Sequence, residues 1–452
     1  MAANAHASSG GRRIVICTFG SPGDLLPFLA VGRELRRRGH DPVLATSEVY
    51  RARAEAMGLG FVPVRPDRPS GVPDPDLMVR VGRGSSPAAA FQRMFLPDLP
   101  ATFADTLDAV AGADLVLSHS LAFTAGTAAT SLGIPWASAV VNPLGYFSRF
   151  DPPEVGPPFV SRIARALGPG PTGAVIRGGK GLVTHWSEPW RRMRADAGLS
   201  PGPEEPVFDG QHSPLLSLAL FSPLLGAPQP DWPASTVQTG FAVLDDPTEP
   251  GMDPALLEFL DAGPAPVVFT LGTTAVLEAG TFYRESARAV ARLGVRAVFL
   301  TGSDPRNLPP DLPKDSIALP YAPHGPLFAR ARATVHQGGV GTLAKAMRAG
   351  APMIVVPYGH DQPDNAGRAE RLGIAQRLDR GRYRRATIER VLAGVLADGA
   401  LRERAAHVGR MVRQEDGARV AADAIERVLG VGPSATEYEA TPDGPEVVLA
   451  TA

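Results

Sequence analysis

The sequence predicts an α/β protein made of two tandem Rossmann-like domains with a cleft between them. Three observations support this fold. With 452 residues, the chain exceeds the size at which one hydrophobic core usually stops growing. In both halves, short apolar β-rich runs alternate with segments of helical spacing. The 49 glycines and 46 prolines favour many short elements joined by turns over a few long helices.

The first half begins with a βαβ unit. An apolar run at 12–19 leads through a Gly/Pro turn at 20–23 to a helical segment at 25–38 and a second apolar run at 42–46. The handedness of such crossovers predicts parallel strands with a helix over one face. The stretch 115–148 lacks Asp, Glu, Lys and Arg but contains several polar residues and prolines. We therefore expect a buried strand, helix and strand there instead of a membrane span.

The middle of the chain is irregular, and a second alternating series follows it. The composition between 147 and 230 is typical of loops that wrap a binding cleft or of an irregular connection. After the proline-rich segment 223–254, strands are predicted at 266–271, 296–301, 333–336 and 352–357, and helices at 280–293, 342–348 and after 362. The helical segment at 401–429 fits either domain.

These patterns divide the chain into five parts. They are a disordered lead at 1–11, a first Rossmann-like domain at 12–225, a linker at 226–250, a second Rossmann-like domain with terminal helices at 251–429, and a mobile tail at 430–452.

Charge and cysteine content restrict the partners and the compartment. The net charge is −1, from 45 basic and 46 acidic residues, so no overall field recruits nucleic acid or an anionic membrane. We expect small-molecule partners. Cys17 is the single cysteine and lies in an apolar run, which predicts a buried thiol and a reducing compartment. The first residues lack an apolar signal core, so a cytoplasmic protein is expected. The sequence does not predict its oligomeric state.

The densest motif is the run V-H-Q-G-G-V-G-T at 335–342, where a strand passes through glycines into a helix. Such a turn exposes backbone N–H groups at a helix N-terminus, and the helix dipole there favours an anion such as a diphosphate. An ordinary strand-to-helix turn is the alternative. The Gly-Lys-Ser/Thr ending of a phosphate-binding P-loop and the GxGxxG pattern are both missing. The candidate residues are His336, Gln337, Gly338, Gly339, Gly341 and Thr342.

An acid and an amide, Asp361 and Gln362, follow the next predicted strand. Together they accept hydrogen bonds from, and donate them to, neighbouring hydroxyls, which is the pattern that a sugar ring requires. We interpret them as sugar-binding residues. The alternative is an N-cap arrangement at the start of a helix.

At this point the chain resembles family 1 glycosyltransferases of the GT-B fold, especially the bacterial antibiotic and sterol glucosyltransferase branches. The resemblance covers about 12–425, and it is weak at about 60–110 and 145–235. Its ordered motifs are G-S-P-G-D at 20–24 with Pro27, Y-A-P-H at 321–324, H-Q-G-G-V-G-T at 336–342 and D-Q-P at 361–363.

The resemblance implies an inverting transfer of a hexose from a UDP- or dTDP-sugar to a hydroxyl of a small acceptor. The first domain would bind the acceptor and the second the donor. Gly272 and Thr273 match the loop that faces the donor diphosphate. Asp361 and Gln362 match the pair on the transferred sugar. The residues that match the stretch bordering the nucleobase, where plant relatives have a Trp, are Tyr321, Ala322 and His324.

The phosphate turn departs from the family pattern. Relatives often carry two histidines there, and the second contacts the diphosphate. Here the pair is His336 and Gln337. In that alignment Gln337 takes the phosphate-facing place, the local positive charge is lower, and His336 is structural. The sequence leaves open which of the two faces the diphosphate.

Asp24 is the candidate general base. It matches the position of a histidine that deprotonates the acceptor hydroxyl in plant relatives, and a carboxylate there would accept the proton as the oxygen attacks the anomeric carbon. The alternative is an N-cap for the helix at 25. His119 follows another predicted strand and would lie beside Asp24, because loops at the carboxyl ends of parallel strands converge. A structural hydrogen bond is the alternative for His119.

No metal site and no cofactor are predicted. Residues 74–76 form a D-P-D run, but they lie in Pro/Gly-rich sequence without a preceding strand, so we interpret them as a loop. GxSxG and HExxH motifs are absent. The charge on the leaving diphosphate would then be met by the amides at 338–342, by the helix dipole and by the Thr273 hydroxyl.

A lipophilic or polyketide-like acceptor is suggested by apolar residues in the first domain, although core packing explains any one of them as well. These residues are Phe91, Phe95, Phe123, Trp136, Phe147 and Phe150. Two other functions fit the same two-domain plan. One is a nucleotide-sugar epimerase, and the other is a non-catalytic nucleotide-sugar-binding partner protein.

Overall fold

The computed structural model describes residues 11–67, 96–155, 158–184, 186–200, 205–244, 246 and 248–431. The lead at 1–10, the D-P-D run at 74–76, Phe91, Phe95 and the tail from 432 onward lie outside the described residues.

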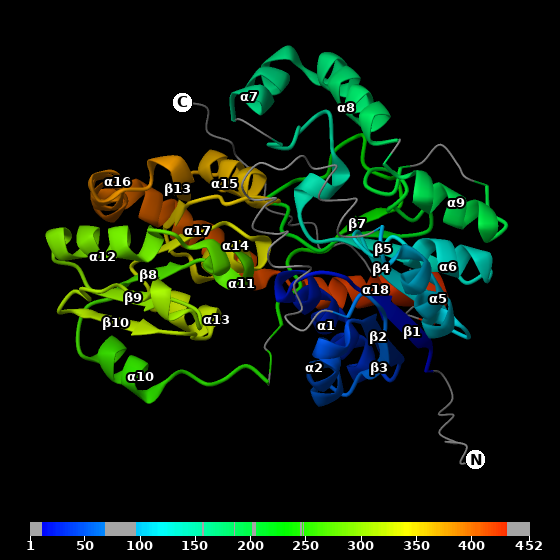
Figure 1. The fold of residues 1–452 in the computed structure, drawn as a ribbon, viewed down its shortest axis with the longest axis horizontal. Helices are drawn as coiled ribbons and strands as arrows, with labels where there is room; N and C mark the ends of the chain where they lie inside the picture. The colour runs from blue at the N-terminus through cyan, green and yellow to red at the C-terminus, as the bar shows by residue number, and fades with distance from the viewer. Residues whose placement is uncertain are drawn as a thin grey trace.

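The first domain is built on a seven-stranded parallel sheet with the strand order β3-β2-β1-β4-β5-β6-β7 (Figure 1). Its strands are β1 (Arg13–Cys17), β2 (Asp41–Thr46), β3 (Gly60–Pro63), β4 (Leu115–His119), β5 (Trp136–Val140), β6 (Ser217–Ala219) and β7 (Thr236–Gln238).

The second domain is built on a six-stranded parallel sheet with the order β10-β9-β8-β11-β12-β13. Its strands are β8 (Val267–Thr270), β9 (Ala297–Leu300), β10 (Ser316–Leu319), β11 (Ala333–His336), β12 (Met353–Val355) and β13 (Ala375–Arg377). In both sheets the chain first winds in one direction and then reverses. The reversal falls between β1 and β4 in the first sheet and between β8 and β11 in the second, and such switch points are where α/β sheets bind ligands.

Helices cover the sheets and connect the two domains. The α-helices are α1 (Pro22–Arg37), α2 (Arg51–Ala56), α5 (Leu99–Val110), α6 (Ala125–Ser131), α7 (Pro158–Leu167), α8 (Pro169–Val183), α9 (Glu188–Asp196), α10 (Pro254–Asp261), α11 (Gly272–Ala275), α12 (Phe282–Leu293), α13 (His324–Phe328), α14 (Val340–Ala349), α15 (Gln362–Arg371), α16 (Arg385–Ala397), α17 (Gly399–Gln414) and α18 (Gly417–Leu429). Short 3-10 helices are η1 (Glu48–Tyr50), η2 (Pro143–Tyr146), η3 (Val276–Glu278), η4 (Pro305–Asn307) and η5 (Arg380–Arg382).

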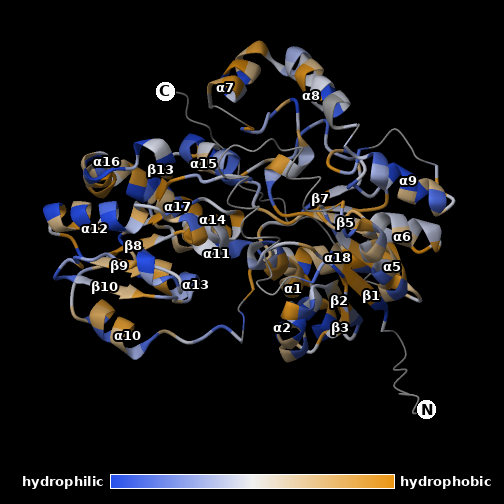
Figure 2. Cartoon of the chain, viewed as in Figure 1, coloured by the Kyte–Doolittle hydropathy of each residue, from blue (hydrophilic) through white to orange (hydrophobic). Residues whose placement is uncertain are grey.

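The apolar runs of the sequence become the centres of the sheets. β4 and β8 are buried along their whole length, as expected for parallel strands covered on both faces. The outer helices α12 and α16 carry both hydrophilic and hydrophobic colours in Figure 2, because only one face of each meets a sheet. The charge-free stretch forms β4, α6 and β5, so the predicted strand, helix and strand are confirmed.

The segment expected to be a linker, 226–250, differs from that prediction. It contributes β7, which pairs with β6 and completes the first sheet. The strand is only three residues long, Thr236–Gln238, and it follows proline-rich sequence. The residue alternation that indicates a strand is therefore too short to recognise in the sequence. The domain boundary therefore lies after β7.

The last helix, α18, returns to the first domain and packs against α1, although the second domain was expected to extend to 429. Arg38 pairs with Asp423 and Glu426 at 2.6 Å each, and Glu426 also contacts His40 at 3.0 Å. Gly417 lies against the backbone of Gly240, where an added Cβ would stand 2.5 Å from the carbonyl oxygen. The preceding helix α17 packs on α14, so the C-terminal segment spans both domains.

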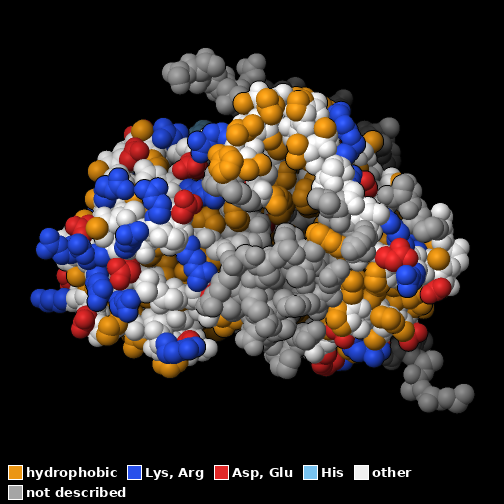
Figure 3. Space-filling model, turned by 45° about the horizontal axis from the view of Figure 1, so that its top comes forward, with side chains coloured by type: hydrophobic (Ala, Val, Ile, Leu, Met, Phe, Trp, Pro, Cys, Tyr) orange, Lys and Arg blue, Asp and Glu red, His pale blue; other side chains and the backbone are white. Residues whose placement is uncertain are grey.

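The irregular middle of the chain contains helices α7, α8 and α9 between β5 and β6. On α7, Phe159, Ile163 and Leu167 are 60%, 52% and 61% exposed. Figure 3 shows hydrophobic side chains gathered over this part of the molecule and bordering a hollow. Among the described residues, no helix is long and apolar enough to cross a membrane. Cys17 is buried, and this burial raises the pKa of its thiol to about 12.

Candidate active site

The turn after β1, at the switch point of the first sheet, carries Asp24. Gly20 has φ +123°, a conformation that favours glycine, and Ser21 is the N-cap of α1. The helix begins at Pro22, so Asp24 is its third residue and not the N-cap that the alternative interpretation assigned to it. Proline at the first helical position and a capping box formed by Ser21 and Asp24 explain the earlier start.

The Asp24 carboxylate is held at one oxygen. Its Oδ2 accepts hydrogen bonds from the backbone N–H and the hydroxyl of Ser21, both at 2.9 Å. A Cβ on Gly20 would stand 2.6 Å from the same oxygen, so a side chain there would displace the carboxylate. The carboxylate is half-buried, and Oδ1 makes no hydrogen bond among the described residues. The geometry therefore leaves Oδ1 available to accept a hydrogen bond.

His119 ends β4, the strand beside β1, and is 2% exposed. Its ring packs edge-on against Phe28 of α1 at 5.2 Å between ring centres, and its Nδ1 has no hydrogen-bond partner. Burial lowers the pKa of His119, and the charge of Asp24 opposes this shift. Within the described part of the chain, no hydrogen bond joins Asp24 to His119. Asp24 is thus close enough to His119 for its charge to affect the pKa of the histidine, but the two side chains are not hydrogen-bonded.

The turn after β11, at the switch point of the second sheet, runs through the predicted glycines into α14. Gly338 has φ +92°, and an added Cβ would stand 2.6 Å from Val355 Cγ1. Gly339 is the N-cap and offers no side chain to the first N–H groups of the helix. Gly341 is half-buried, whereas the Thr342 side chain is buried.

His336 and Gln337 differ in the directions that they face. His336 is fully buried at the end of β11, its Nδ1 accepts from the Gly338 N–H at 3.1 Å, and burial lowers its pKa to about 3. The Gln337 side chain lies between the turn that follows β8 and the turn that follows β11. Its Nε2 is 3.5 Å from Thr342 Oγ1, and a Cβ on Gly272 would stand 2.3 Å from it.

The loop after β8 supplies Gly272, with φ +62°, and Thr273 in the short helix α11. Gly272 is half-buried beside Gln337, and Thr273 is exposed. The structure therefore brings Gly272 and the 336–342 turn together, as the strand order requires.

Asp361 and Gln362 open α15, directly after the loop that follows β12. Asp361 holds the N-cap position, yet its side chain makes no capping bond and instead accepts from Asn365 Nδ2 at 2.7 Å. Burial, together with the charge of Asp24, raises the pKa of Asp361 to about 7. Gln362 is buried, and its Oε1 accepts from the N–H groups of Tyr358 and Gly359 at 2.8 and 3.2 Å. Its carbonyl oxygen is thus occupied, whereas its Nε2 makes no hydrogen bond within the described residues.

The segment 321–324 borders the same edge of the second sheet. Tyr321 is 47% exposed, and its hydroxyl donates to Glu249. Ala322 is buried, and His324 begins α13 with its ring stacked on Phe328 at 4.9 Å. His324 Nε2 is 3.4 Å from Thr270 Oγ1, at the end of β8. Burial lowers the pKa of His324 to about 3, so the ring is neutral at physiological pH.

The two switch points face each other across the domain boundary. A Cβ on Gly341 would stand 3.8 Å from Gly23 Cα, so the N-termini of α1 and α14 are in contact distance. The charge of Asp24 also acts on His360 and Asp361 of the second domain. The acid of the first domain and the glycine-rich turn of the second therefore lie side by side.

Three residues of this site were not predicted. Asn365 is fully buried and joins Asp361 to the Gly338 carbonyl oxygen at 2.9 Å, and its position four residues after Asp361 is the signal that places both on one helix face. His360 has φ +57°, which is uncommon for a residue other than glycine. Tyr50 donates to the Gly20 carbonyl oxygen at 3.1 Å, and nothing in the sequence pattern indicates this contact.

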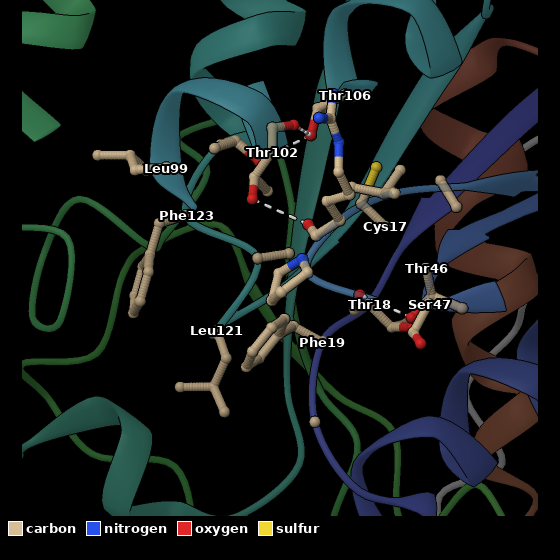
Figure 4. Close-up of a pocket in the computed structure, with 17 residues that line it drawn as sticks. Cys17, Thr18, Phe19, Thr46, Ser47, Leu99, Thr102, Thr106, Leu121 and Phe123 are labelled. Atoms are coloured by element: carbon tan, nitrogen blue, oxygen red, sulfur yellow. Dashed lines mark hydrogen bonds between the residues drawn. The ribbon is translucent and has the colours of Figure 1, made fainter. Parts of the chain in front are cut away.

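A pocket opens in the first domain beside the Asp24 turn (Figure 4). Phe19, Leu121 and Phe123 contribute apolar side chains, and the threonines Thr102 and Thr106 line another part of it. Phe123 was among the apolar residues predicted to contact the acceptor. The other described members lie elsewhere: Trp136 packs in the core, Phe147 packs against Phe208, and Phe150 is 40% exposed.

Two family models match the sequence, one for each domain. The glycosyltransferase family 28 N-terminal domain matches residues 14–135, and the C-terminal domain of erythromycin biosynthesis protein CIII-like proteins matches residues 289–426.

Known proteins are similar over most of the chain. O-mycaminosyltylonolide 6-deoxyallosyltransferase of Streptomyces fradiae is 33% identical over 92% of this chain and 97% of its own length. A sterol 3-beta-glucosyltransferase of Leptosphaeria maculans is 28% identical over 95% of this chain, which spans 30% of that longer protein. The structure of the glycosyltransferase VinC in complex with dTDP superposes with a TM-score of 0.66 at 18% identity, over 93% of this chain and all of VinC. The predicted GT-B fold is confirmed, and the transferase is favoured over the epimerase and the non-catalytic binding protein.

Proposed function

Because the chain belongs to the GT-B glycosyltransferases that combine a family 28 N-terminal domain with an erythromycin CIII-like C-terminal domain, we propose that it transfers a hexose from a UDP- or dTDP-sugar to a hydroxyl of a small lipophilic acceptor. The single observation that carries this proposal is the contact between the Asp24 turn and the N-terminus of α14. It would join the proton acceptor and the anion-binding turn that the proposal requires in one site.

The donor would lie on the second domain. The first N–H groups of α14 have no partner within the helix, although that of Val340 also contacts the Asp361 carboxylate. The positive end of the helix dipole faces the same point. A diphosphate would accept hydrogen bonds from these amides, and Gln337 Nε2 would add a neutral donor. This assigns the phosphate-facing place to Gln337 and a structural place to His336, whose Nδ1 is already bonded to Gly338. VinC was solved with dTDP, which supports a nucleoside diphosphate as the ligand.

The sugar would lie between Asp361 and Asp24. Asp361 would accept from the sugar hydroxyls, and the Nε2 of Gln362 would donate to one of them. Gln362 Oε1 would remain on the loop N–H groups. The pair would therefore hold the sugar through one carboxylate and one amide nitrogen.

The acceptor would enter through the pocket beside Gly20. Its Phe19, Leu121 and Phe123 side chains suit an apolar aglycone, and the names of the relatives include a tylonolide derivative and sterols. Asp24 would remove the acceptor hydroxyl proton while that oxygen forms a bond to the anomeric carbon. The bond from this carbon to the diphosphate would break on the opposite face, which inverts the anomeric configuration.

We also propose that no metal ion takes part. The α14 amides, the helix dipole and the exposed Thr273 hydroxyl would stabilise the negative charge that develops on the diphosphate. The proposal is tested by turnover in excess EDTA, which is expected to remain unchanged.

The substrate assignment is tested by thermal unfolding of the full chain with UDP-, dTDP- and GDP-glucose. A donor at one hundred times its Kd stabilises a protein by about 2.7 kcal/mol, so we expect a clear rise in Tm with a UDP- or dTDP-sugar. The stabilising donor is then incubated with lipophilic alcohols, and NMR of the product reports the anomeric configuration. A retained configuration, or conversion of the donor without an acceptor, would refute the proposal.

A further inference from the structure

An ion-pair network that is buried at its centre joins the two domains at α15. We call it the α15 network, and its members are Asp151, Glu154, Arg165, Asp364, Arg368, Arg371 and Arg377. Asp151, Glu154 and Arg165 of α7 belong to the first domain, and the others belong to α15 and β13 of the second.

Arg368 is at the centre of the network. Its Nε donates to Asp364 Oδ2 at 2.7 Å, and its Nη1 donates to the carboxylate of Asp151 across the boundary. The other oxygen of Asp364 accepts from the backbone N–H of Glu154 at 2.9 Å. The side chains of Arg368 and Asp364 are 3% and 1% exposed. A charge buried to this extent is costly without its partner. Arg368 and Asp364 neutralise each other within α15, and Asp151 and the Glu154 N–H of the first domain provide their remaining contacts.

The Glu154 carboxylate makes a second set of contacts. It pairs with Arg377 Nη1 at 2.6 Å and with Arg371 Nη1 at 3.5 Å. It also lies directly on α15 at Gly367, where an added Cβ would stand 2.4 Å from Glu154 Oε1. A side chain at Gly367 would therefore displace the Glu154 carboxylate from its contacts at the domain boundary.

The same helix carries the sugar-binding residues of the proposed function. Asp361 and Gln362 stand at its N-terminus, and Arg368 follows about two turns later on the rigid backbone of α15. Asn365, between them, is bonded to both Asp361 and Gly338. A shift of α15 at Arg368 would consequently move Asp361 relative to the 336–342 turn.

We infer that Arg368, held by Asp151 of the first domain, is a positioning residue for Asp361 and Gln362, so that contact between the domains sets the sugar part of the donor site. This inference rests on the proposed function. It separates the donor into two parts: the nucleoside diphosphate held by α14, and the sugar held by an α15 that depends on the first domain.

Asp151→Asn and Gly367→Ala test the inference in the full chain, with Gly394→Ala in α16 as the matched control. Gly394 has open space around it, so its alanine variant carries the same chemical change without a neighbour. Calorimetry gives Kd for UDP or dTDP, whichever wild type binds more tightly, and for the corresponding glucose nucleotide. We expect both test variants to bind the free nucleotide within about twofold of wild type and the glucose nucleotide at least fivefold more weakly. The control should match wild type in both measurements.

Two results would overturn the positioning role. One is binding of the glucose nucleotide that is unchanged in both test variants. The other is an equal loss for nucleotide and glucose nucleotide, because a merely structural defect does not distinguish them. If wild type binds no nucleotide at all, the proposed donor fails as well, and that result is distinguishable because it appears before any variant is made.

Discussion

The two glycine-rich turns that meet in the site are built alike but are neutralised differently. In each, a parallel strand ends at a switch point, a glycine with positive φ turns the chain, and a helix begins. In the first domain, the positive end of α1 is neutralised by a carboxylate of the same helix, because Asp24 accepts hydrogen bonds from the N–H and the hydroxyl of Ser21. In the second domain the N-cap is Gly339, which has no side chain. The first turn is therefore neutralised by a carboxylate of its own helix. The second has no capping side chain, and the carboxylate beside it is that of Asp361, which accepts from the Val340 N–H.

The largest effect is expected when the first turn loses its charge. Asp24→Asn keeps the size of the side chain but removes the proton acceptor, and general base catalysis typically contributes about 10²- to 10⁴-fold. We expect kcat to fall by at least about a hundredfold, while the Kd of the nucleotide sugar stays within a few-fold of wild type. Steady-state kinetics and calorimetry measure the two quantities. Undiminished turnover in this variant would exclude Asp24 as the base.

A carboxylate placed on the second turn should make it resemble the first. Gly341→Asp adds a negative charge beside the α14 amides, and the nearest atom to its Cβ would be Gly23 Cα at 3.8 Å. Repulsion between close charges near a protein surface amounts to a few kcal/mol, so donor binding should weaken at least about tenfold. Gly341→Asn is the matched control, since it has the same shape without the charge. Equal donor Kd values for the Asp and Asn variants would show that no anion binds there.

The pH dependence of donor binding should report Asp361. Its pKa is raised to about 7 by burial and by Asp24, so the carboxylate proposed to accept hydrogen bonds from sugar hydroxyls is mostly protonated at pH 6 and mostly ionised at pH 8. We expect the donor KM to fall about tenfold between these values in wild type, as the ionised fraction rises. The KM of Asp361→Asn should be higher and nearly independent of pH. A wild-type KM that rises with pH over this range would contradict the assignment.

The ionisation of Asp361 should also make the free energy of unfolding fall as the pH rises. An acid whose pKa is higher in the folded protein than in the unfolded chain binds more protons when folded. The contribution of Asp361 to the free energy of unfolding is therefore largest below pH 4, and it declines as the pH rises towards 7. The difference in Tm between wild type and Asp361→Asn should shift in favour of the variant over this window.

The smallest effects are expected from the two turn glycines. Gly20→Ala and Gly338→Ala both place a side chain at positive φ, which costs about 1–3 kcal/mol of stability. The Cβ of Gly20→Ala would also clash with Asp24 Oδ2, which should lower kcat. The Cβ of Gly338→Ala would clash with Val355, which should raise the donor Kd. Gly39→Ala is the control, because Gly39 has φ +89° with open space around it. If both test variants changed the same constant, the first turn would not act on kcat and the second on donor binding as proposed.

Local pattern was enough to predict the parts of the site that lie within one strand-turn-helix unit. β11 was predicted at its exact bounds, 333–336, because it is a buried apolar run stopped by glycines. The helix after it and the Asp24 turn were found for the same reason. Each of these depends on neighbours in the sequence, whose spacing carries the information.

The features that depend on distant partners were not predictable in this way. The apolar face of α18 fits either domain, and contacts with distant residues of the first domain, among them Arg38 and His40, determine its position. The three-residue strands β7 and β13 are too short for their alternation to be recognised. The meeting of Gly23 with Gly341 depends on the placement of the two domains, which no local period encodes.

The proposed donor site requires the main-chain amides of α14 to hold the diphosphate without a cation. Amide NMR of the ¹⁵N-labelled protein in excess EDTA, titrated with dTDP or UDP, tests this directly. We expect saturable shifts that are largest at Val340, Gly341 and Thr342, with little change at Gly23 and Asp24 in the first turn of α1. Absence of saturable binding until a divalent cation is added, or shifts centred away from α14, would contradict it.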